Sequence, residues 1–288
     1  MIERVWRPGF ALQLTPILGV HRRGAHDPAF RIVPDGSVWR AVHTPDGPGT
    51  LAVAMHDAEV AARAWGPGAG WLIDQLPDFL GAHDDPTALE LDTPVLRRLA
   101  GRSPGLRIGR TTRVWDALVA AVIEQKVTGS EAYRGWQYLV RRYGEPAPGP
   151  GGLTVPPPRE RWREITEADW HRSGLEPVRM RIIRRAATVD VENKVDVLTA
   201  LPGVGPWTAA HVRIRALGDP DAVPFGDYHV PRIVGQTLIG RPVDDAEMTR
   251  LLEPYAGQRY RVVRMCEVAG RFPERRGPRM PTRDYRSF

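Results

Sequence analysis

The sequence of 288 residues predicts an α+β protein, in which an N-terminal antiparallel sheet packs on an all-helical second part. Short alternating runs separated by Pro-Asp-Gly turns fill roughly the first 85 residues, which is typical of an antiparallel sheet. From about residue 86 the apolar residues recur at helical spacing. We therefore expect a mixed sheet and helix domain over 1–93, a helical domain over 94–272, and a basic C-terminal tail over 273–288.

Four strands and one helix are expected in the first domain. Pro-Asp-Gly at residues 34–36 and again at 45–47 predicts turns between neighbouring strands. The expected strands are Phe10–Leu14, Phe30–Val33, Val38–Val42 and Thr50–Met55, and the expected helix is Asp57–Trp65.

Nine helices are expected in the second domain. Residues 145–158 between them are rich in proline and glycine and predict a loop, while Trp115, Tyr133 and Trp136 are expected in the core. The helices are Trp115–Glu124, Tyr133–Val140, Glu167–Arg172, Pro177–Ala187, Val195–Ala200, Trp207–Ala216, Val230–Ile239, Asp245–Leu252 and Arg259–Val268.

The composition is that of an ordinary globular protein, with 42% hydrophobic and 26% charged residues. No apolar run reaches the roughly 18 residues of a membrane span, and the N-terminus does not look like a signal peptide, so we expect a cytosolic protein. The single cysteine, Cys266, excludes an intrachain disulfide and a four-cysteine zinc or iron–sulfur site. It lies among apolar residues and is expected to be a buried, inert thiol.

The charge is unevenly distributed along the chain. Residues 1–98 hold nine arginines and no lysine against twelve acidic residues, a net charge of −3. Because the whole chain carries +6, residues 99–288 carry a net charge of +9. A polyanion should therefore bind the second domain. Because the chain has only two lysines, Lys126 and Lys194, a general preference for arginine is an alternative explanation.

The segment Leu201–Ala210, Leu-Pro-Gly-Val-Gly-Pro-Trp-Thr-Ala-Ala, is the most informative in the chain. A helix ends at a Pro-Gly turn, and Pro206 suits the first position of the next helix. Gly203 and Gly205 lack side chains, so a phosphate can approach backbone N–H groups at a helix N-terminus, while the valine between them enters the core. A tight turn without a ligand is the alternative, and the flanking residues favour phosphate binding.

This hairpin resembles the helix-hairpin-helix of the base-excision DNA glycosylases. The segment Val223–Arg232, which contains Asp-Tyr-His-Val-Pro-Arg, resembles the loop that presents the family's essential aspartate, and its distance from the hairpin is the family's. From Pro94 to Gly270 the chain is similar to the bacterial inducible 3-methyladenine glycosylases (DNA-3-methyladenine glycosylase II). The resemblance implies an N-terminal sheet domain and a helical glycosylase domain with its helix-hairpin-helix over residues 195–217.

The resemblance implies that Asp227 is the catalytic residue. A carboxylate can stabilise the cationic sugar formed as the base leaves, or activate water. Asp227 could instead only cap a helix, and the neighbouring Asp219 and Asp221 are expected in a turn. Superfamily members that also cut the strand carry a lysine after the hairpin for Schiff-base chemistry. Here that position is Trp207, so we expect base removal by water without AP-lyase activity.

The resemblance places Trp207, His211 and Tyr228 at the pocket for the flipped base. Aromatic faces would stack on an electron-poor alkylated base, although Trp207 also fits a core position at a helix start. The sequence departs from the family at two places near this pocket. His211 replaces an aromatic residue, and Gly226 replaces an acidic residue often found before the aspartate.

The DNA contacts implied by the resemblance involve the hairpin and two flanking segments. Lys126 stands where the family has an apolar wedge, which a lysine cannot imitate, although it can bind phosphate or span the minor groove; a solvated surface lysine is the alternative. The implied DNA-binding residues are Gly203, Val204, Gly205, Thr208, Gln125, Lys126 and Arg232. A structural Na⁺ or K⁺ is implied at the backbone carbonyls of Thr199, Leu201 and Val204, and no cofactor is required.

Together these residues predict a monofunctional DNA glycosylase that hydrolyses the N-glycosidic bond of alkylated purines, such as 3-methyladenine, in base-excision repair. We expect a cytoplasmic, nucleoid-associated monomer whose partner is double-stranded DNA with a damaged base, and no membrane. Two alternatives stay open. One is a glycosylase for an oxidised or deaminated base, and the other is a weak or inactive protein of the same fold that binds lesions or unusual DNA structures. Lys126, His211 and Gly226 favour the latter, and the retained Asp227 argues against it.

Overall fold

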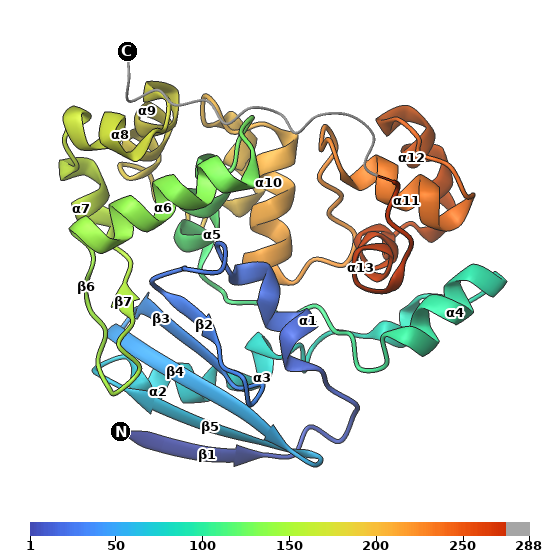
Figure 1. Ribbon diagram of the computed structural model, residues 1–288, viewed down its shortest axis with the longest axis horizontal. Coiled ribbons are helices and arrows are strands. Elements are labelled where there is room, and N and C mark those ends of the chain that lie inside the picture. The colour runs from blue at the N-terminus through green and yellow to red at the C-terminus, as the bar shows by residue number, and fades with distance from the viewer. Residues whose placement is uncertain (275–288) are drawn as a thin grey trace.

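A five-stranded antiparallel sheet forms one side of the molecule, and helices form the other (Figure 1). The structure is a computed structural model that describes residues 1–274, so residues 275–288 of the predicted tail lie outside it. The sheet has the order β1-β5-β4-β3-β2. Its strands are β1 Ile2–Trp6, β2 Phe30–Ile32, β3 Val38–Thr44, β4 Gly47–His56 and β5 Glu59–Trp65. The predicted α+β class is confirmed, and so are the strands that correspond to β2, β3 and β4.

The expected helix over residues 57–65 is wrong, because Glu59–Trp65 is strand β5. Val60, Ala62 and Ala64 are buried whereas Arg63 faces solvent, so burial alternates with the period of a strand. The segment contains three alanines, and alanine has the highest helix propensity. Pairing with β4 on one side and β1 on the other overrides that local preference.

The expected strand over residues 10–14 is also wrong. The chain turns at Gly9, whose φ is +70°, and Leu14 already begins helix α1, Leu14–Leu18. Leu12 and Leu14 are buried, but in the core beside the sheet instead of in a strand. The fifth strand, which the sequence analysis missed, is Ile2–Trp6, and it pairs with β5 at the sheet edge.

Two short helices complete the sheet layer, α2 Ala69–Asp74 and α3 Leu76–Phe79. Helix α2 packs on strands β1, β4 and β5. The buried apolar residues of this layer form one cluster that runs in sequence from Leu12 to Leu80. The sheet thus has its own core.

All nine expected helices are present as helical segments, and the structure adds α4 and α7. The α-helices of this layer are α4 Pro94–Arg102, α5 Val114–Ile123, α6 Gly129–Tyr143, α7 Arg159–Glu164, α8 Glu167–Ser173, α9 Pro177–Ala186, α10 Pro206–Val212, α11 Val230–Leu238, α12 Asp245–Leu252 and α13 Arg259–Ala269. The expected helix over 195–200 is a 3₁₀ segment, η3 Val195–Ala200, and α10 continues into a π-helical turn, η4 Arg213–Leu217.

The helical layer has two cores. One joins α5, α6, α8, α9 and α10, and the other joins α4 to α11, α12 and α13. In Figure 1 these groups lie on the left and the right, and the segment from η3 to α10 stands between them. The expected core residues Trp115 and Trp136 are buried in the first group, and Tyr133 packs against it. The segment from η3 to α10 packs on the first of these cores through Leu198, Val204 and Val212.

The loop predicted over residues 145–158 contains a small two-stranded ribbon, β6 Glu145–Pro146 and β7 Thr154–Val155. It extends from α6 to the sheet, where Leu153 and Val155 pack against Ala41 of β3 (Figure 1). This ribbon fastens the two layers to each other.

Cys266 is fully buried, as expected, and burial raises the pKa of its thiol to about 12. A thiol of this kind stays protonated near neutral pH and is a poor nucleophile. Within residues 1–274, no helix has the combination of length and apolarity that a membrane span requires.

Candidate active site

The hairpin adopts the geometry that its glycines predicted. Gly203 has a φ of +92°, and a side chain at this position would lie 2.5 Å from Ile182 of α9. Val204 is 3% exposed and packs into the core of the helical layer, so the predicted plug is confirmed. Gly205 faces open space, and Pro206 is the first residue of α10. The turn therefore exposes backbone N–H groups at a helix start while its valine anchors it.

Gln125 and Thr208 brace the hairpin from inside. The side-chain amide of Gln125 donates to the carbonyl oxygen of Gly203, at 2.9 Å, and to Oγ1 of Thr208, at 2.8 Å. Arg179, which is 1% exposed, in turn donates to the carbonyl of Gln125. Because Thr208 is itself 2% exposed, its side chain supports the turn and presents no surface to DNA.

Asp227 lies at the start of α11 with its carboxylate fixed by three hydrogen bonds. Oδ1 accepts from the backbone N–H groups of His229, at 2.7 Å, and Val230, at 3.0 Å. Oδ2 accepts from Nε1 of Trp207, at 3.0 Å. Asp227 therefore does cap a helix, and the cap leaves its second oxygen directed at the residue that follows the hairpin. The structure thus brings together the two motifs that the sequence analysis singled out.

The loop before Asp227 depends on a residue that the sequence analysis missed. Oδ2 of Asp245, the first residue of α12, accepts from the N–H of Gly226 at 2.8 Å. Gly226 has a φ of +86°, a conformation that favours glycine. This explains why glycine stands there in place of the family's acidic residue. No pattern in the sequence linked Asp245 to this loop.

Trp207 and His211 form one aromatic pair on α10. Their ring centroids are 4.2 Å apart in an edge-to-face arrangement, with an angle of 63° between the planes. Trp207 is half-buried and uses its N–H for Asp227. Removal from solvent, followed by the charge of Arg215, lowers the pKa of His211 to about 3, so this ring is uncharged near neutral pH. The pair therefore offers an aromatic edge beside the carboxylate without adding positive charge.

A buried ion cluster lies one helical turn further on. Glu124, which directly follows α5, accepts from Arg215 of η4 at 2.8 Å and lies 2.9 Å from Nε of Arg23. Burial alone would raise the pKa of Glu124, but Arg215 and Arg23 outweigh it and lower the pKa to about 2. The sequence analysis missed this cluster, because its members are far apart in the chain and none belongs to a motif.

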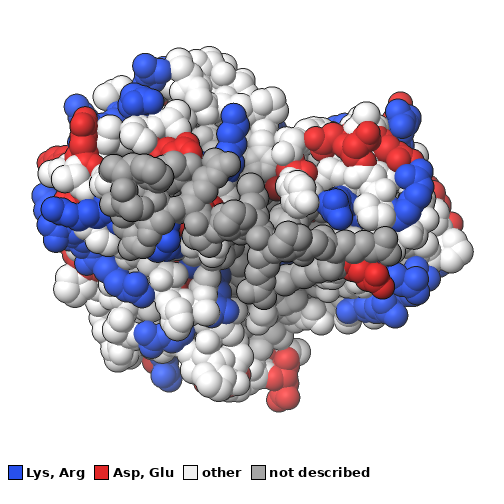
Figure 2. Space-filling view, turned by 45° about the horizontal axis from the view of Figure 1, so that its top comes forward, with Lys and Arg blue, Asp and Glu red and all other residues white. Residues whose placement is uncertain are grey.

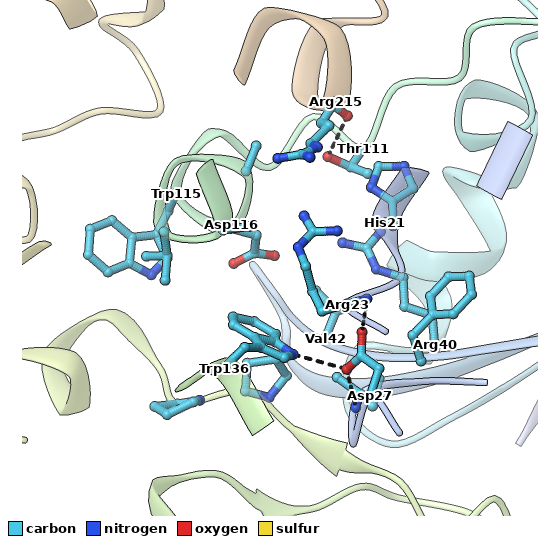
Figure 3. A pocket seen from close by; sticks show the side chains of 18 of the residues that line it. His21, Arg23, Asp27, Arg40, Val42, Thr111, Trp115, Asp116, Trp136 and Arg215 are labelled. Atoms are coloured by element: carbon cyan, nitrogen blue, oxygen red, sulfur yellow. Dashed lines mark hydrogen bonds between the residues drawn. The ribbon is translucent and has the colours of Figure 1, made fainter. Parts of the chain in front are cut away.

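A cavity of about 50 Å³ lies behind this cluster, between the sheet and α5 (Figure 3). Arg23, Arg215 and Asp116 project toward one another across it, while Trp136 donates to Asp27 at 3.0 Å. A space of this size holds a few water molecules. It is too small for a purine base, so it is the polar interior of the domain interface and does not form the base pocket.

Three predicted residues are placed at the surface. Lys126 is exposed in the loop after α5 and has a left-handed backbone, with a φ of +49°. Tyr228 is 73% exposed, and the guanidinium of Arg232 lies 5.6 Å from the centroid of its ring. Unlike His211, Tyr228 therefore does not line the Trp207–Asp227 contact. It forms an aromatic and basic surface next to it.

Most exposed basic residues belong to the helical domain, as the charge distribution predicted, while the sheet domain exposes Arg7, Arg31 and Arg63. On the face shown in Figure 2, many Lys and Arg side chains lie over the left lobe, the side of α7 to α9, with acidic side chains among them, and the right lobe also carries both signs. The exposed arginines of α7, α8 and α9 are Arg161, Arg163, Arg172, Arg181 and Arg185. These arginines are basic groups of the kind that a polyanion can contact, although Glu164 pairs with one of them, Arg161.

The predicted monovalent-cation site at the carbonyls of Thr199, Leu201 and Val204 stays a prediction. The carbonyl oxygen of Leu201 accepts from the N–H of Val204 at 2.9 Å, so part of its capacity is used within the turn. A carbonyl oxygen has a second lone pair, which is compatible with a cation. No cluster of three or more His, Cys, Asp or Glu side chains suited to a metal occurs within residues 1–274.

The two-layer arrangement with the hairpin facing the aspartate loop is the fold of the helix-hairpin-helix DNA glycosylases. The chain superimposes on the 3-methyladenine DNA glycosylase from Archaeoglobus fulgidus with a TM-score of 0.76 and 18% identity, covering 93% of this chain and 97% of the other. For MBOgg1 in complex with a low-affinity DNA ligand the TM-score is 0.74 at 18% identity, covering 93% and 95%. For the 8-oxoguanine glycosylase/lyase of Clostridium acetobutylicum the TM-score is 0.72 at 13% identity, covering 94% and 97%.

A curated relative shows the likeness in sequence as well. The chain is 36% identical, over 169 residues, to a protein of Mycobacterium tuberculosis described as a probable bifunctional transcriptional activator/DNA repair enzyme AlkA. The match covers 54% of this chain and 33% of the relative, so the chain spans about a third of that relative's length. No family model matches the sequence. The predicted resemblance to this superfamily, on the 3-methyladenine side of it, is thereby confirmed.

Proposed function

We propose that this protein is a DNA glycosylase of base-excision repair that removes a damaged base from double-stranded DNA. The observation that supports the proposal is the hydrogen bond between Trp207 and Asp227, which orients a carboxylate next to the hairpin that we propose binds phosphate. A DNA strand held at Gly203 and Gly205 would bring a flipped nucleotide to that carboxylate. The DNA repair relative and the glycosylase structures of the same fold support the proposal.

The chemistry follows from one carboxylate and one water molecule. As the bond between the base and C1′ breaks, positive charge develops on the sugar, and the negative Asp227 stabilises it. Water then attacks C1′ and loses a proton, and the base leaves either with a proton or, if it was a cation, as a neutral molecule. Because Trp207 occupies the place of the Schiff-base lysine, the proposed reaction ends at base removal.

We propose alkylated purines, the class of 3-methyladenine, as the substrates. The aromatic pair Trp207 and His211 beside Asp227 supports stacking on a flat base, and Tyr228 with Arg232 offers a surface for the DNA around it. The proposed enzyme acts as a monomer in the cytoplasm, associated with the nucleoid, and the cation predicted at the hairpin would be structural.

The test is release of free base from duplex oligonucleotides that carry 3-methyladenine, 7-methylguanine, hypoxanthine or ethenoadenine. We expect release by the wild type and its loss in Asp227→Asn. Asp219→Asn is the matched control, since Asp219 is a nearby carboxylate that binds Arg213 at 2.8 Å and does not touch Trp207. Release that survives Asp227→Asn would overturn the catalytic assignment. DNA binding without release from any lesion would instead support the lesion-binding alternative.

A further inference from the structure

His211 contacts the ring of Trp207 and also lies within the electrostatic influence of Arg215. On one side its ring packs on Trp207, which holds Asp227, so a single aromatic ring separates it from the carboxylate. On the other side lies Arg215, one helical turn along the same face, in its ion pair with Glu124. His211 is therefore the link between the reaction centre and the buried ion cluster.

The second observation is an unused hydrogen-bonding atom. Nε2 of His211 is buried and has no partner among the described residues. Leaving a buried polar atom unpaired is unfavourable, so such an atom next to a reaction centre is suited to the polar edge of a ligand. A neutral imidazole carries one donor and one acceptor, and it can therefore meet either kind of atom on a base.

The third observation is the charge around the ring. Arg215 and Arg23 are both buried, at 9% and 6% exposed, and they share the single carboxylate of Glu124. Nη1 of Arg215 is buried without a partner as well. Removal from solvent and the charge of Arg215 keep a proton off His211, against the weaker attraction of Glu124 and Asp227. The same two effects would act on a cationic base placed against this ring.

We propose that His211 is a specificity-determining residue that hydrogen-bonds the edge of an uncharged alkylated purine, so that the protein prefers neutral members of this class to cationic ones. The inference rests on the proposed function and ranks its substrates: 3-methyladenine and 7-methylguanine are cations in DNA, so His211 would favour neutral alkylated purines over both. Ethenoadenine carries no charge and keeps ring nitrogens that accept hydrogen bonds, whereas 7-methylguanine in DNA is a cation. Both bases are alkylated, but only 7-methylguanine is charged. A difference between their release rates therefore does not come from alkylation alone.

The experiment measures single-turnover release of ethenoadenine and of 7-methylguanine from the same duplex sequence, by the wild type and by His211→Phe. Comparing variant with wild type for each base cancels the different intrinsic lability of the two glycosidic bonds. We expect His211→Phe to slow ethenoadenine release at least tenfold and to leave 7-methylguanine release within about threefold, or faster. His211→Gln, which keeps a neutral hydrogen-bonding group, should restore most of the ethenoadenine rate.

His21→Phe is the matched control, because His21 is another half-buried histidine of the domain interface whose ring contacts Phe79 instead of Trp207. His21→Phe should release both bases at the wild-type rates. Equal loss of both rates in His211→Phe, or a greater loss for 7-methylguanine, would overturn the proposal. If the wild type releases only 7-methylguanine, and Asp227→Asn abolishes this, the specificity proposal fails while the glycosylase function stands. If no damaged base is released at all, both fail.

Discussion

Nε1 of Trp207 donates a hydrogen bond of 3.0 Å to Oδ2 of Asp227. This bond joins the first turn of α10 to the loop before α11 and fixes the one carboxylate oxygen that the helix cap does not use. Trp207 is therefore a positioning residue as well as part of the aromatic pair with His211. Trp207 has no amine and cannot form a Schiff base. It instead aligns Asp227, the carboxylate proposed to act in the reaction.

Trp207→Phe should slow base release about tenfold or more, with little effect on DNA affinity. The substitution keeps a ring against His211 and removes only the donor to a charged acceptor, a bond worth about 1.5–3 kcal/mol. Single-turnover release and equilibrium binding, measured on the same duplex, check this. Trp136→Phe is the control, since it removes an indole bond of the same length to Asp27, away from Asp227. It should lower thermal stability without slowing release, and equal slowing by both variants would contradict the positioning role.

Borohydride should trap no covalent adduct between the protein and DNA that carries a substrate base. Schiff-base formation needs an uncharged amine at C1′ of the sugar, and the residue in that place is Trp207. The measurement is a denaturing gel of the reduced reaction, together with strand cleavage before and after alkali. An adduct, or strand cuts without alkali, would show a lyase step and refute the monofunctional assignment.

Gly205→Asp should weaken binding to every DNA sequence alike while leaving the fold intact. A side chain at Gly205 meets no atom within 4 Å, so a carboxylate there changes the charge at the hairpin without disturbing packing. We expect at least a tenfold loss of affinity, because an anion then faces the phosphate. Fluorescence anisotropy with damaged and undamaged duplexes measures it, and a loss confined to damaged DNA would contradict phosphate binding.

Gly203 provides the matched comparison for that experiment. Its φ of +92° and the 2.5 Å approach to Ile182 mean that Gly203→Ala should destabilise the hairpin even without added charge. Thermal unfolding should separate the two positions, with a clear drop for Gly203→Ala and almost none for Gly205→Ala. Equal behaviour of the two alanine variants would show that the turn geometry is not the one described.

Glu124→Gln should destabilise the protein by about 3–5 kcal/mol near pH 7, since it removes the carboxylate that pairs directly with the two buried arginines Arg23 and Arg215. Because the pKa of Glu124 is lowered to about 2, its contribution is complete above its ordinary pKa of about 4.5. It is lost as the pH falls from there toward 2, where wild type and variant should converge. Urea unfolding across this range measures the difference.

Glu164→Gln is the control for the ion cluster. Glu164 pairs with Arg161 at 2.8 Å on the surface, where both side chains are more than half exposed. Exposed pairs contribute little, so this variant should cost less than about 1 kcal/mol. A cost for Glu124→Gln no larger than that of Glu164→Gln would show that the buried cluster does not stabilise the domain interface.

The hairpin and the aspartate loop could be predicted because their geometry is encoded by adjacent residues. Gly203 permits a positive φ, Val204 supplies the apolar plug, and Pro206 begins a helix, whatever lies around them. The helices of the second domain were predictable for a similar reason, since their apolar periodicity shows which face is buried. The alanine-rich segment of β5 was predicted as a helix, but it forms a strand because it pairs with β1 and β4.

The surroundings of the site were decided only by the tertiary structure. Glu124 and Arg215 are 91 positions apart, and nothing in either neighbourhood indicates that folding will pair them, or that burial and the charge of Arg215 will lower the pKa of His211. The hydrogen bond from Gly226 to Asp245 and the burial of the Thr208 side chain likewise depend on contacts that only folding creates. The sequence alone thus determined the hairpin around Gly203 and Gly205 and the position of the Asp227 carboxylate, because both depend on local backbone geometry. Which side chains surround them depends on long-range burial, because the free energy of a buried charge or polar atom is set by neighbours that only folding brings together.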